Sequence, residues 1–284
     1  MAILQSDNHA GVLKNFTQLF GFREWCSYGE FYVVENKQLD EVNGEANNLA
    51  YTGLPLPFHT DLPHYASPPQ VQLLHCISQA SCDGGSNKLV DGFAVAEQLR
   101  RQHPEEFELL ATVRMEYKDF HRETLWDSGP GGEDATDGTA FGGRPNDTPR
   151  LGNRREVDFF LRHSHPVISV EDPTDMSSRI TRINYSDHHR DSVFNHVTAD
   201  KVKAYYKACK RWDAFLNEES NVIWNKLRPG DILCFDNRRV LHGRSGFQVQ
   251  AGEVRKLIGT YLRWDEIRSM ARIGASRAFP NLLI

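Results

Sequence analysis

Short apolar runs bounded by Gly, Pro, Asp or Asn recur along most of this 284-residue chain. Such runs are typical of the strands of a β-sandwich or barrel, because branched and aromatic side chains pack well on a pleated surface. The runs lie at residues 31–36, 71–77, 87–92, 112–117, 165–172, 178–185, 231–237 and 254–264. They predict a mainly β protein with a jelly-roll core and flanking helices.

Helical periodicity is confined to three segments, at residues 93–103, 104–110 and 198–217. In the last segment apolar residues such as Trp212 recur with a period near 3.6, which predicts one buried face. Thr198 precedes this segment and is a suitable N-cap. We therefore expect three helices that pack against the β core.

One segment, at residues 128–152, is rich in Gly, Pro, Asp and Thr and poor in aliphatic side chains. A segment of this composition buries too little apolar surface to offset its ordering entropy, so we expect a flexible insertion. Both flanks have the same strand-like pattern. The sequence therefore predicts one domain over residues 1–284 with an inserted loop.

Charge and cysteine content narrow the class of protein. The formal net charge is −5, which argues against a nucleic-acid partner, and no apolar run is long enough for a membrane span. The first residues resemble neither a signal peptide nor a transit peptide. The five cysteines have no paired spacing, so we expect reduced thiols and a cytoplasmic location.

The clearest chemical motif is His59-Thr60-Asp61. Alternate side chains of an extended segment share a face, so His59 and Asp61 can ligate one metal ion. His242 follows another strand-like run and offers a third ligand, which completes the two-histidine, one-carboxylate triad of non-haem iron sites. An isolated His-x-Asp pair carries little information on its own, and other histidines are rival ligands: His64, His75, His163, His165, His188 and His189.

Arg255 supports the interpretation of the three candidates as metal ligands. On the extended run from 254 to 264 it shares a face with Tyr261, and an arginine on the inner face of a barrel is costly unless it holds an anion. Its planar fork suits the far carboxylate of a dicarboxylic keto acid. The alternative is a surface arginine on an edge strand, next to Lys256.

Taken together, these residues and their surroundings resemble a known family. The stretches at 47–77, 84–93, 182–185 and 227–244, with Arg255, resemble the γ-butyrobetaine and trimethyllysine dioxygenases of the taurine-dioxygenase-like Fe(II)/2-oxoglutarate oxygenases. The resemblance implies a double-stranded β-helix, with Fe(II) on His59, Asp61 and His242. It also implies 2-oxoglutarate with its remote carboxylate on Arg255, O2 as the oxidant and ascorbate as a reductant. Asn87 stands where the family has a hydroxyl residue that also contacts 2-oxoglutarate.

The same resemblance implies a substrate site for a trimethylammonium group. An aromatic cage binds such a cation through ring faces. By resemblance, the cage tyrosines are Tyr28, Tyr32, Tyr51 and Tyr261. Asn48 and Ser186 correspond to asparagines that bind the substrate carboxylate, and Asn184 lies two residues before Ser186 on the same face.

The resemblance implies hydroxylation of γ-butyrobetaine to L-carnitine, with succinate and CO2 as co-products. The alternatives are hydroxylation of trimethyllysine by the same chemistry, a non-catalytic barrel that binds a betaine or a metal, and a zinc hydrolase. The family also has an N-terminal Cys/His zinc module that contributes to a homodimer. We expect that module to be absent from residues 1–284, which leaves homodimer formation open.

Overall fold

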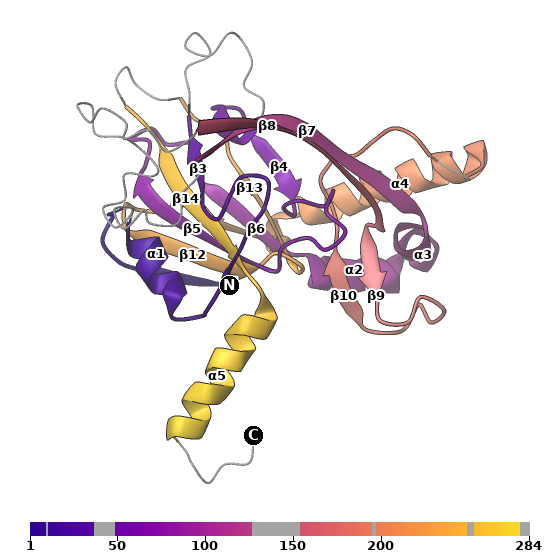
Figure 1. Cartoon of the computed structure of the whole chain (residues 1–284). Coiled ribbons are helices and arrows are strands. Elements are labelled where there is room, and N and C mark those ends of the chain that lie inside the picture. Colours follow the sequence, from indigo (N-terminus) through magenta and orange to yellow (C-terminus); the bar gives the residue numbers. More distant parts are fainter. Residues whose placement is uncertain (10, 37–48, 127–153, 195–196, 249–252, 279–284) are drawn as a thin grey trace.

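The computed structural model describes residues 1–9, 11–36, 49–126, 154–194, 197–248 and 253–278. Two antiparallel sheets form the body of the protein (Figure 1). The larger one, called the major sheet here, has the strand order β1-β12-β5-β14-β2, and β3 also pairs with β14. Its strands are β1 (Ala2–Gln5), β2 (Arg23–Glu24), β3 (Tyr32–Glu35), β5 (Val71–Ser78), β12 (Asp231–Asp236) and β14 (Lys256–Leu262).

The other sheet, called the minor sheet here, has the order β11-β6-β13-β4. Its strands are β4 (Leu56–His59), β6 (Asn87–Asp91), β11 (Val222–Asn225) and β13 (Val240–Arg244). From β4 to β6, and again from β11 to β14, successive strands alternate between the two sheets. This alternation is the jelly-roll arrangement, so the expected fold class is confirmed.

Two apolar layers cover the major sheet. On its inner face Leu74 and Leu257 pack with Leu89 of the minor sheet. On its outer face Leu73 packs with Leu13 of α1 (Gly11–Gln18). Because both faces are covered, the first six residues of β5 are all buried, including the polar Gln72 and His75.

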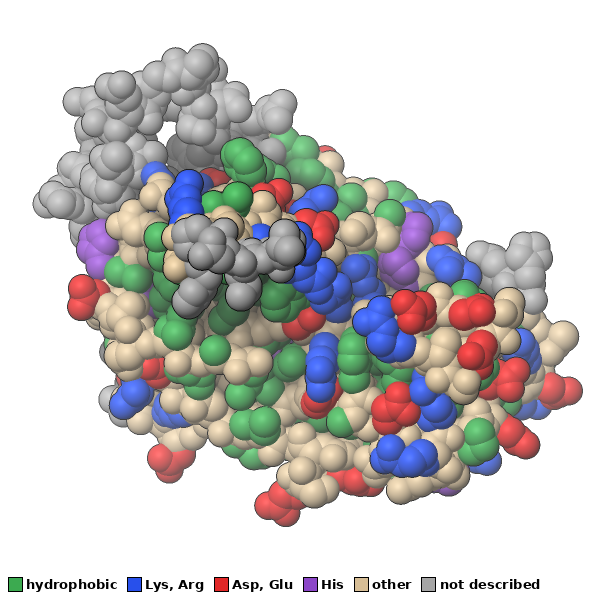
Figure 2. Space-filling view, turned by 90° about the horizontal axis from the view of Figure 1, so that it is seen from below, with side chains coloured by type: hydrophobic (Ala, Val, Ile, Leu, Met, Phe, Trp, Pro, Cys, Tyr) green, Lys and Arg blue, Asp and Glu red, His purple; other side chains and the backbone are tan. Residues whose placement is uncertain are grey.

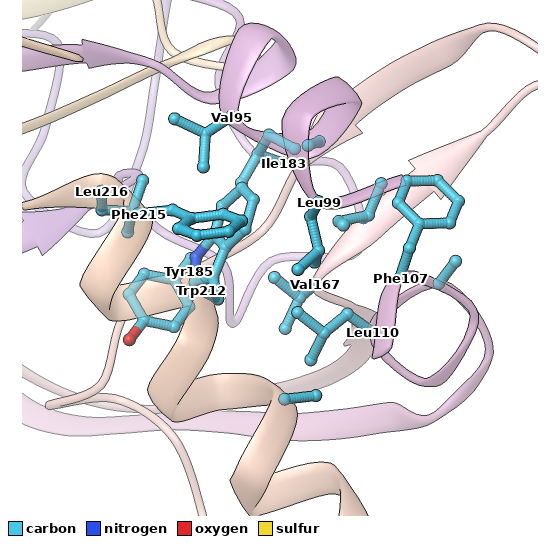
Figure 3. Packing of buried hydrophobic residues seen from close by; sticks show 14 of the residues in the cluster. Val95, Leu99, Phe107, Leu110, Val167, Ile183, Tyr185, Trp212, Phe215 and Leu216 are labelled. Carbon is cyan, nitrogen blue, oxygen red and sulfur yellow. The ribbon is translucent and has the colours of Figure 1, made fainter. Parts of the chain in front are cut away.

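A third apolar layer joins the helices to the end of the minor sheet. It involves α2 (Gly92–Gln102), α3 (Pro104–Thr112) and α4 (Ala199–Leu216). Figure 3 shows Trp212 of α4 lying against Tyr185, with Leu99 of α2 near Leu110 of α3. As expected, Thr198 caps α4 by accepting a hydrogen bond from the Lys201 amide.

In the described part of the chain, two further antiparallel strand pairs lie outside the two sheets. The long strands β7 (Arg114–Trp126) and β8 (Arg154–Pro166) form a two-stranded ribbon that crosses the upper part of the molecule in Figure 1. The shorter pair is β9 (Ile168–Val170) and β10 (Ile180–Ile183). The remaining elements are α5 (Trp264–Ala278), which projects from the body in Figure 1, and two short 3-10 helices, η1 (Leu49–Tyr51) and η4 (Glu219–Asn221).

Most expected elements coincide with observed ones, but the expectation of three helices missed α1 and α5, and two expected strands are shifted. The strand expected at 112–117 begins only at Arg114, because α3 continues through Thr112. The run at 165–172 is divided between the end of β8 and β9. The expected insertion at 128–152 lies outside the described residues.

Several global features bear on the class of protein. All five cysteines are free thiols. Among the described residues, no helix combines the length and apolar character needed to cross a bilayer. Figure 2 shows acidic and basic side chains intermingled over one face of the molecule.

Candidate active site

Strand pairing brings the three expected metal ligands together. β4 and β13 are neighbours in the minor sheet, and their register places His242 directly opposite His59. Asp61 follows β4 by two residues. Its Oδ1 lies 3.3 Å from Nε2 of His59 and 3.5 Å from Nε2 of His242. Metal bonds to such ligands are about 2.0–2.2 Å long, so ligand atoms at right angles lie about 3 Å apart. The three atoms therefore converge at a spacing that fits one metal ion.

Hydrogen bonds from neighbouring groups hold the ligands in this orientation. Nδ1 of His59 lies 3.0 Å from the Pro57 carbonyl, which leaves Nε2 free to face the other ligands. The Asp61 amide donates to Oδ1 of Asn237 at 2.7 Å, and the Asn237 amide nitrogen donates back to the Asp61 carbonyl at 3.1 Å. Tyr261 donates to Oδ2 of Asp61 at 2.6 Å. The second carboxylate oxygen, Oδ1, is thereby directed toward the two imidazoles.

The protonation states suit metal binding. Burial raises the pKa of Asp61, but His242, His59 and the Tyr261 hydroxyl outweigh burial and hold that pKa well below its usual range. Burial, reinforced by the charge of His59, lowers the pKa of His242 to about 3. A carboxylate and a neutral imidazole are the forms that ligate metals.

Two buried arginines line the same pocket as the metal-ligand candidates. Arg255 is 2% exposed, and its Nε donates to Oε1 of Gln79 at 3.1 Å. Arg244 donates to the carbonyls of Ala50, Thr52 and Leu54. Within the described residues neither arginine has a carboxylate partner, so this part of the pocket is suited to an anion.

Four tyrosines form another part of the pocket wall: Tyr28, Tyr32, Tyr51 and Tyr261. The ring centroids of Tyr32 and Tyr261 are 5.2 Å apart, and those of Tyr28 and Tyr32 are 6.3 Å apart. Gln72 fixes Tyr32 by donating a 2.7 Å hydrogen bond to its hydroxyl oxygen. Aromatic faces grouped in this way suit a cationic ligand.

The ring of Tyr32 lies directly over the backbone of Gly259. A Cβ atom added at Gly259 would meet the ring at 2.1 Å, so only glycine allows this close approach. Strand pairing sets the position, because Gly259 of β14 lies opposite Tyr32 of β3.

The remaining residues that the sequence predicts in the site do not all line the pocket. Asn87 lines the pocket, and its Nδ2 is buried with no hydrogen-bond partner among the described residues. Asn184 and Ser186 do not line it. The Asn184 amide donates to the Pro166 carbonyl and to Oγ of Ser169, and Ser186 contacts His189. Asn48 lies outside the described residues.

The pocket is also lined by residues that the sequence does not predict there: Arg244, Gln72, His188 and His189. Arg244 follows His242 by two residues on β13, so period-two alternation could have placed it on the same face. His188 and His189 appeared only as rival metal ligands. Their place in the pocket depends on a turn after β10, for which the sequence has no local signal.

Comparison with known proteins gives one family. The model of the family described as taurine catabolism dioxygenase TauD, TfdA family, matches residues 7–261. Human gamma-butyrobetaine dioxygenase is 31% identical over 263 residues, which are 93% of this chain and 57% of that protein. Mitochondrial trimethyllysine dioxygenase of Gallus gallus is 31% identical over 231 residues, which are 80% of this chain and 44% of that protein. The chain thus spans about half the length of these relatives.

Solved structures show the same fold. The PvcB protein of Pseudomonas aeruginosa has a TM-score of 0.53 at 15% identity, over 89% of this chain and 70% of that one. A taurine dioxygenase of Burkholderia xenovorans has a TM-score of 0.52 at 16% identity, over 89% of this chain and 72% of that one. At this level of sequence identity, the similarity to these structures shows a shared fold.

Proposed function

The chain belongs to the taurine catabolism dioxygenase TauD, TfdA family, and from this premise we propose that it is an Fe(II)- and 2-oxoglutarate-dependent hydroxylase of a trimethylammonium substrate. Within that class we propose γ-butyrobetaine as the substrate and L-carnitine as the product. The names of the relatives support this choice, since gamma-butyrobetaine dioxygenase matches 93% of the chain. Trimethyllysine is the second candidate, because trimethyllysine dioxygenase is equally identical over 80% of the chain.

In this proposal His59, Asp61 and His242 hold Fe(II). The spacing of their ligand atoms and the fixed orientation of His59 support the assignment. A facial triad leaves positions open for other ligands of the metal. When bound, iron and 2-oxoglutarate supply the oxidation: the keto acid loses CO2 to give succinate, and one oxygen atom of O2 is inserted into a C–H bond.

Arg255 holds the remote carboxylate of 2-oxoglutarate. Its guanidinium is buried in the pocket without a carboxylate partner among the described residues, and its planar fork matches a carboxylate. The unpartnered Nδ2 of Asn87 can donate a second hydrogen bond to the same anion. Arg244 packs against the same ring as Arg255. The guanidinium of Arg244 lies 4.6 Å from the centroid of the Phe247 ring, and that of Arg255 lies 5.4 Å from it.

The observation that best supports the substrate class is the position of the tyrosines relative to the metal-ligand candidates. Tyr261 both stacks with Tyr32 and hydrogen-bonds Asp61, so the aromatic wall and the ligand triad share one side chain. A cation held by the tyrosines would lie beside the metal, with its neighbouring C–H bonds near the oxidising centre. The protein's contribution is then orientation and exclusion of water.

The test is a substrate panel. Purified protein with Fe(II), ascorbate and 2-oxoglutarate is incubated with γ-butyrobetaine, trimethyllysine or neither, and succinate and the hydroxylated product are measured. We expect succinate and carnitine in equal amounts with γ-butyrobetaine. Turnover only with trimethyllysine would select the second candidate. Substrate binding without succinate formation would identify a non-catalytic barrel.

A further inference from the structure

A second group of metal-ligating side chains lies beside the pocket, and we propose that it is a binding site for a divalent transition metal of the Zn²⁺ class. The group consists of His64, Asp119 and His189. One ligand atom from each lies within 4.8 Å of those of the other two. None of the three belongs to the triad assigned to iron. Two imidazoles and a carboxylate are ligands that Zn²⁺ accepts in proteins.

The state of His64 is the observation that points to a ligand. Its side chain is 1% exposed, yet neither ring nitrogen has a hydrogen-bond partner among the described residues. Its Nε2 lies 3.8 Å from Oδ2 of Asp119, too far for a hydrogen bond. Buried polar atoms are normally paired, so an unpaired imidazole directed at a carboxylate calls for a bound group between them.

The protonation states in the group suit a bound metal ion. Burial, with the charge of His189, lowers the pKa of His64 to about 4, and burial also lowers the pKa of His189. Burial raises the pKa of Asp119, but His121 and the other histidines outweigh it, so the pKa lies below its usual value. Near neutral pH the group therefore has neutral imidazoles around one negative carboxylate.

Backbone hydrogen bonds fix the group in place. The Lys118 amide on β7 donates to the His189 carbonyl at 2.9 Å, and the Asp191 amide donates to the Glu116 carbonyl at 2.8 Å. The turn that carries His189 is thereby attached alongside β7, which carries Asp119. A site that is held on paired backbone segments is preorganised for a ligand.

Neighbouring side chains orient the ligands in the way usual around metals. Oγ of Ser186 lies 2.9 Å from Nδ1 of His189, which leaves Nε2 of His189 for a metal. Nδ1 of His121 lies 2.8 Å from Oδ2 of Asp119. The His121 ring stacks on Tyr28 at 4.9 Å, and the Tyr28 hydroxyl lies 3.5 Å from the same Asp119 oxygen.

A trimethylammonium group would not account for these features. It has neither an N–H nor a lone pair, so it cannot complete the coordination of the His64 and His189 ring nitrogens. A metal ion accepts both nitrogens and neutralises Asp119. Because His189 also lines the pocket, the metal would form part of the wall next to Tyr28.

The experiment measures metal binding by His64, Asp119 and His189 separately from binding by the ligands assigned to iron. His59→Ala/His242→Ala removes two of the three ligands assigned to iron, and the double variant is titrated with Co²⁺ alone while the visible absorption of the metal is recorded. We expect one equivalent to bind, with the d–d bands of a nitrogen- and oxygen-ligated ion, and Zn²⁺ to displace it. Adding His64→Ala or the near-isosteric Asp119→Asn should weaken Co²⁺ binding at least tenfold.

His163→Ala in the double variant is the matched control, because His163 is not part of either ligand group. It should leave the Co²⁺ titration unchanged. Zn²⁺ should raise the melting temperature of the double variant and of the control, but not that of the Asp119→Asn variant. No Co²⁺ binding in the double variant, or binding unaffected by both His64→Ala and Asp119→Asn, overturns the proposal. The result is independent of which substrate the enzyme hydroxylates.

Discussion

The hydroxyl of Tyr261 donates a 2.6 Å hydrogen bond to Oδ2 of Asp61. One residue of the aromatic wall thus positions the only carboxylate of the proposed iron triad. The hydroxyl group and the ring face of Tyr261 therefore have separate roles, which substitutions can distinguish.

Tyr261→Phe retains the ring and removes the hydrogen bond to Asp61. Loss of a partner that orients a metal ligand costs 10- to 100-fold in metal affinity in other sites, so we expect about a tenfold higher half-saturating Fe(II) concentration. The KM for the trimethylammonium substrate should change much less. Tyr205→Phe, in α4 and away from the pocket, is the control. An unchanged Fe(II) requirement would show that the hydrogen bond does not tune the metal.

Arg255→Lys retains the positive charge but loses the planar fork. A hydrogen bond to a charged group contributes about 1.5–3 kcal/mol. We therefore expect the KM for 2-oxoglutarate to rise roughly 10- to 100-fold, with the Fe(II) requirement unaltered. Arg239→Lys changes an exposed ion pair with Asp91 and should leave the KM within about twofold. Equal effects of the two variants would contradict the assignment of Arg255.

Tyr32→Leu removes an aromatic face from the pocket. A cation–π contact contributes about 1–2 kcal/mol when it is desolvated, so the KM for the cationic substrate should rise roughly 5- to 30-fold. Tyr32→Phe keeps the face and should recover most of the affinity. An uncharged substrate analogue, with carbon in place of the ammonium nitrogen, serves as a competitor. Its inhibition constant should be similar in the Leu and Phe variants, and a parallel loss would indicate a packing defect instead.

Gly259→Ala tests the contact under Tyr32. The added Cβ would lie 2.1 Å from the ring, so the ring must move or the strand must shift. Overpacking of this kind costs about 1–3 kcal/mol of stability, and we expect a lower melting temperature together with a raised KM for the substrate. Gly274→Ala in α5 has open space around its Cβ and should be neutral or stabilising. Similar melting temperatures for both variants would contradict the crowding at Gly259.

The sequence predicts best what depends on local pattern. The apolar residues of Val71–Ser78 fall on both faces of the strand, and burial on both faces of the sheet explains this pattern. His59 and Asp61 are two residues apart after an extended strand, so their proximity follows from backbone geometry. The opposition of His242 and His59 depends on strand register, which the sequence suggests only through the resemblance.

What the sequence does not predict is mostly nonlocal. The β7–β8 ribbon is buried on one side, where Met115, Tyr117 and His121 lie, and exposed on the other, where Phe120 and Phe160 are at the surface. Beyond Tyr117 the inward positions of β7 are Asp119 and His121, so the apolar alternation that predicts a strand stops before the strand does. The grouping of His64, Asp119 and His189 draws on three segments far apart in the chain. Asn184 is expected from the sequence as a substrate contact. Its amide instead donates to the Pro166 carbonyl and to Oγ of Ser169.

The segment from β2 to β3, whose two strands both pair with β14, is separate from the strands that hold the metal-ligand candidates. It carries Tyr28 and Tyr32, while the proposed iron ligands lie on or just after β4 and on β13, within the other sheet. Substitutions of Tyr28 or Tyr32 therefore change the aromatic wall without removing a proposed iron ligand or a side chain that hydrogen-bonds to one.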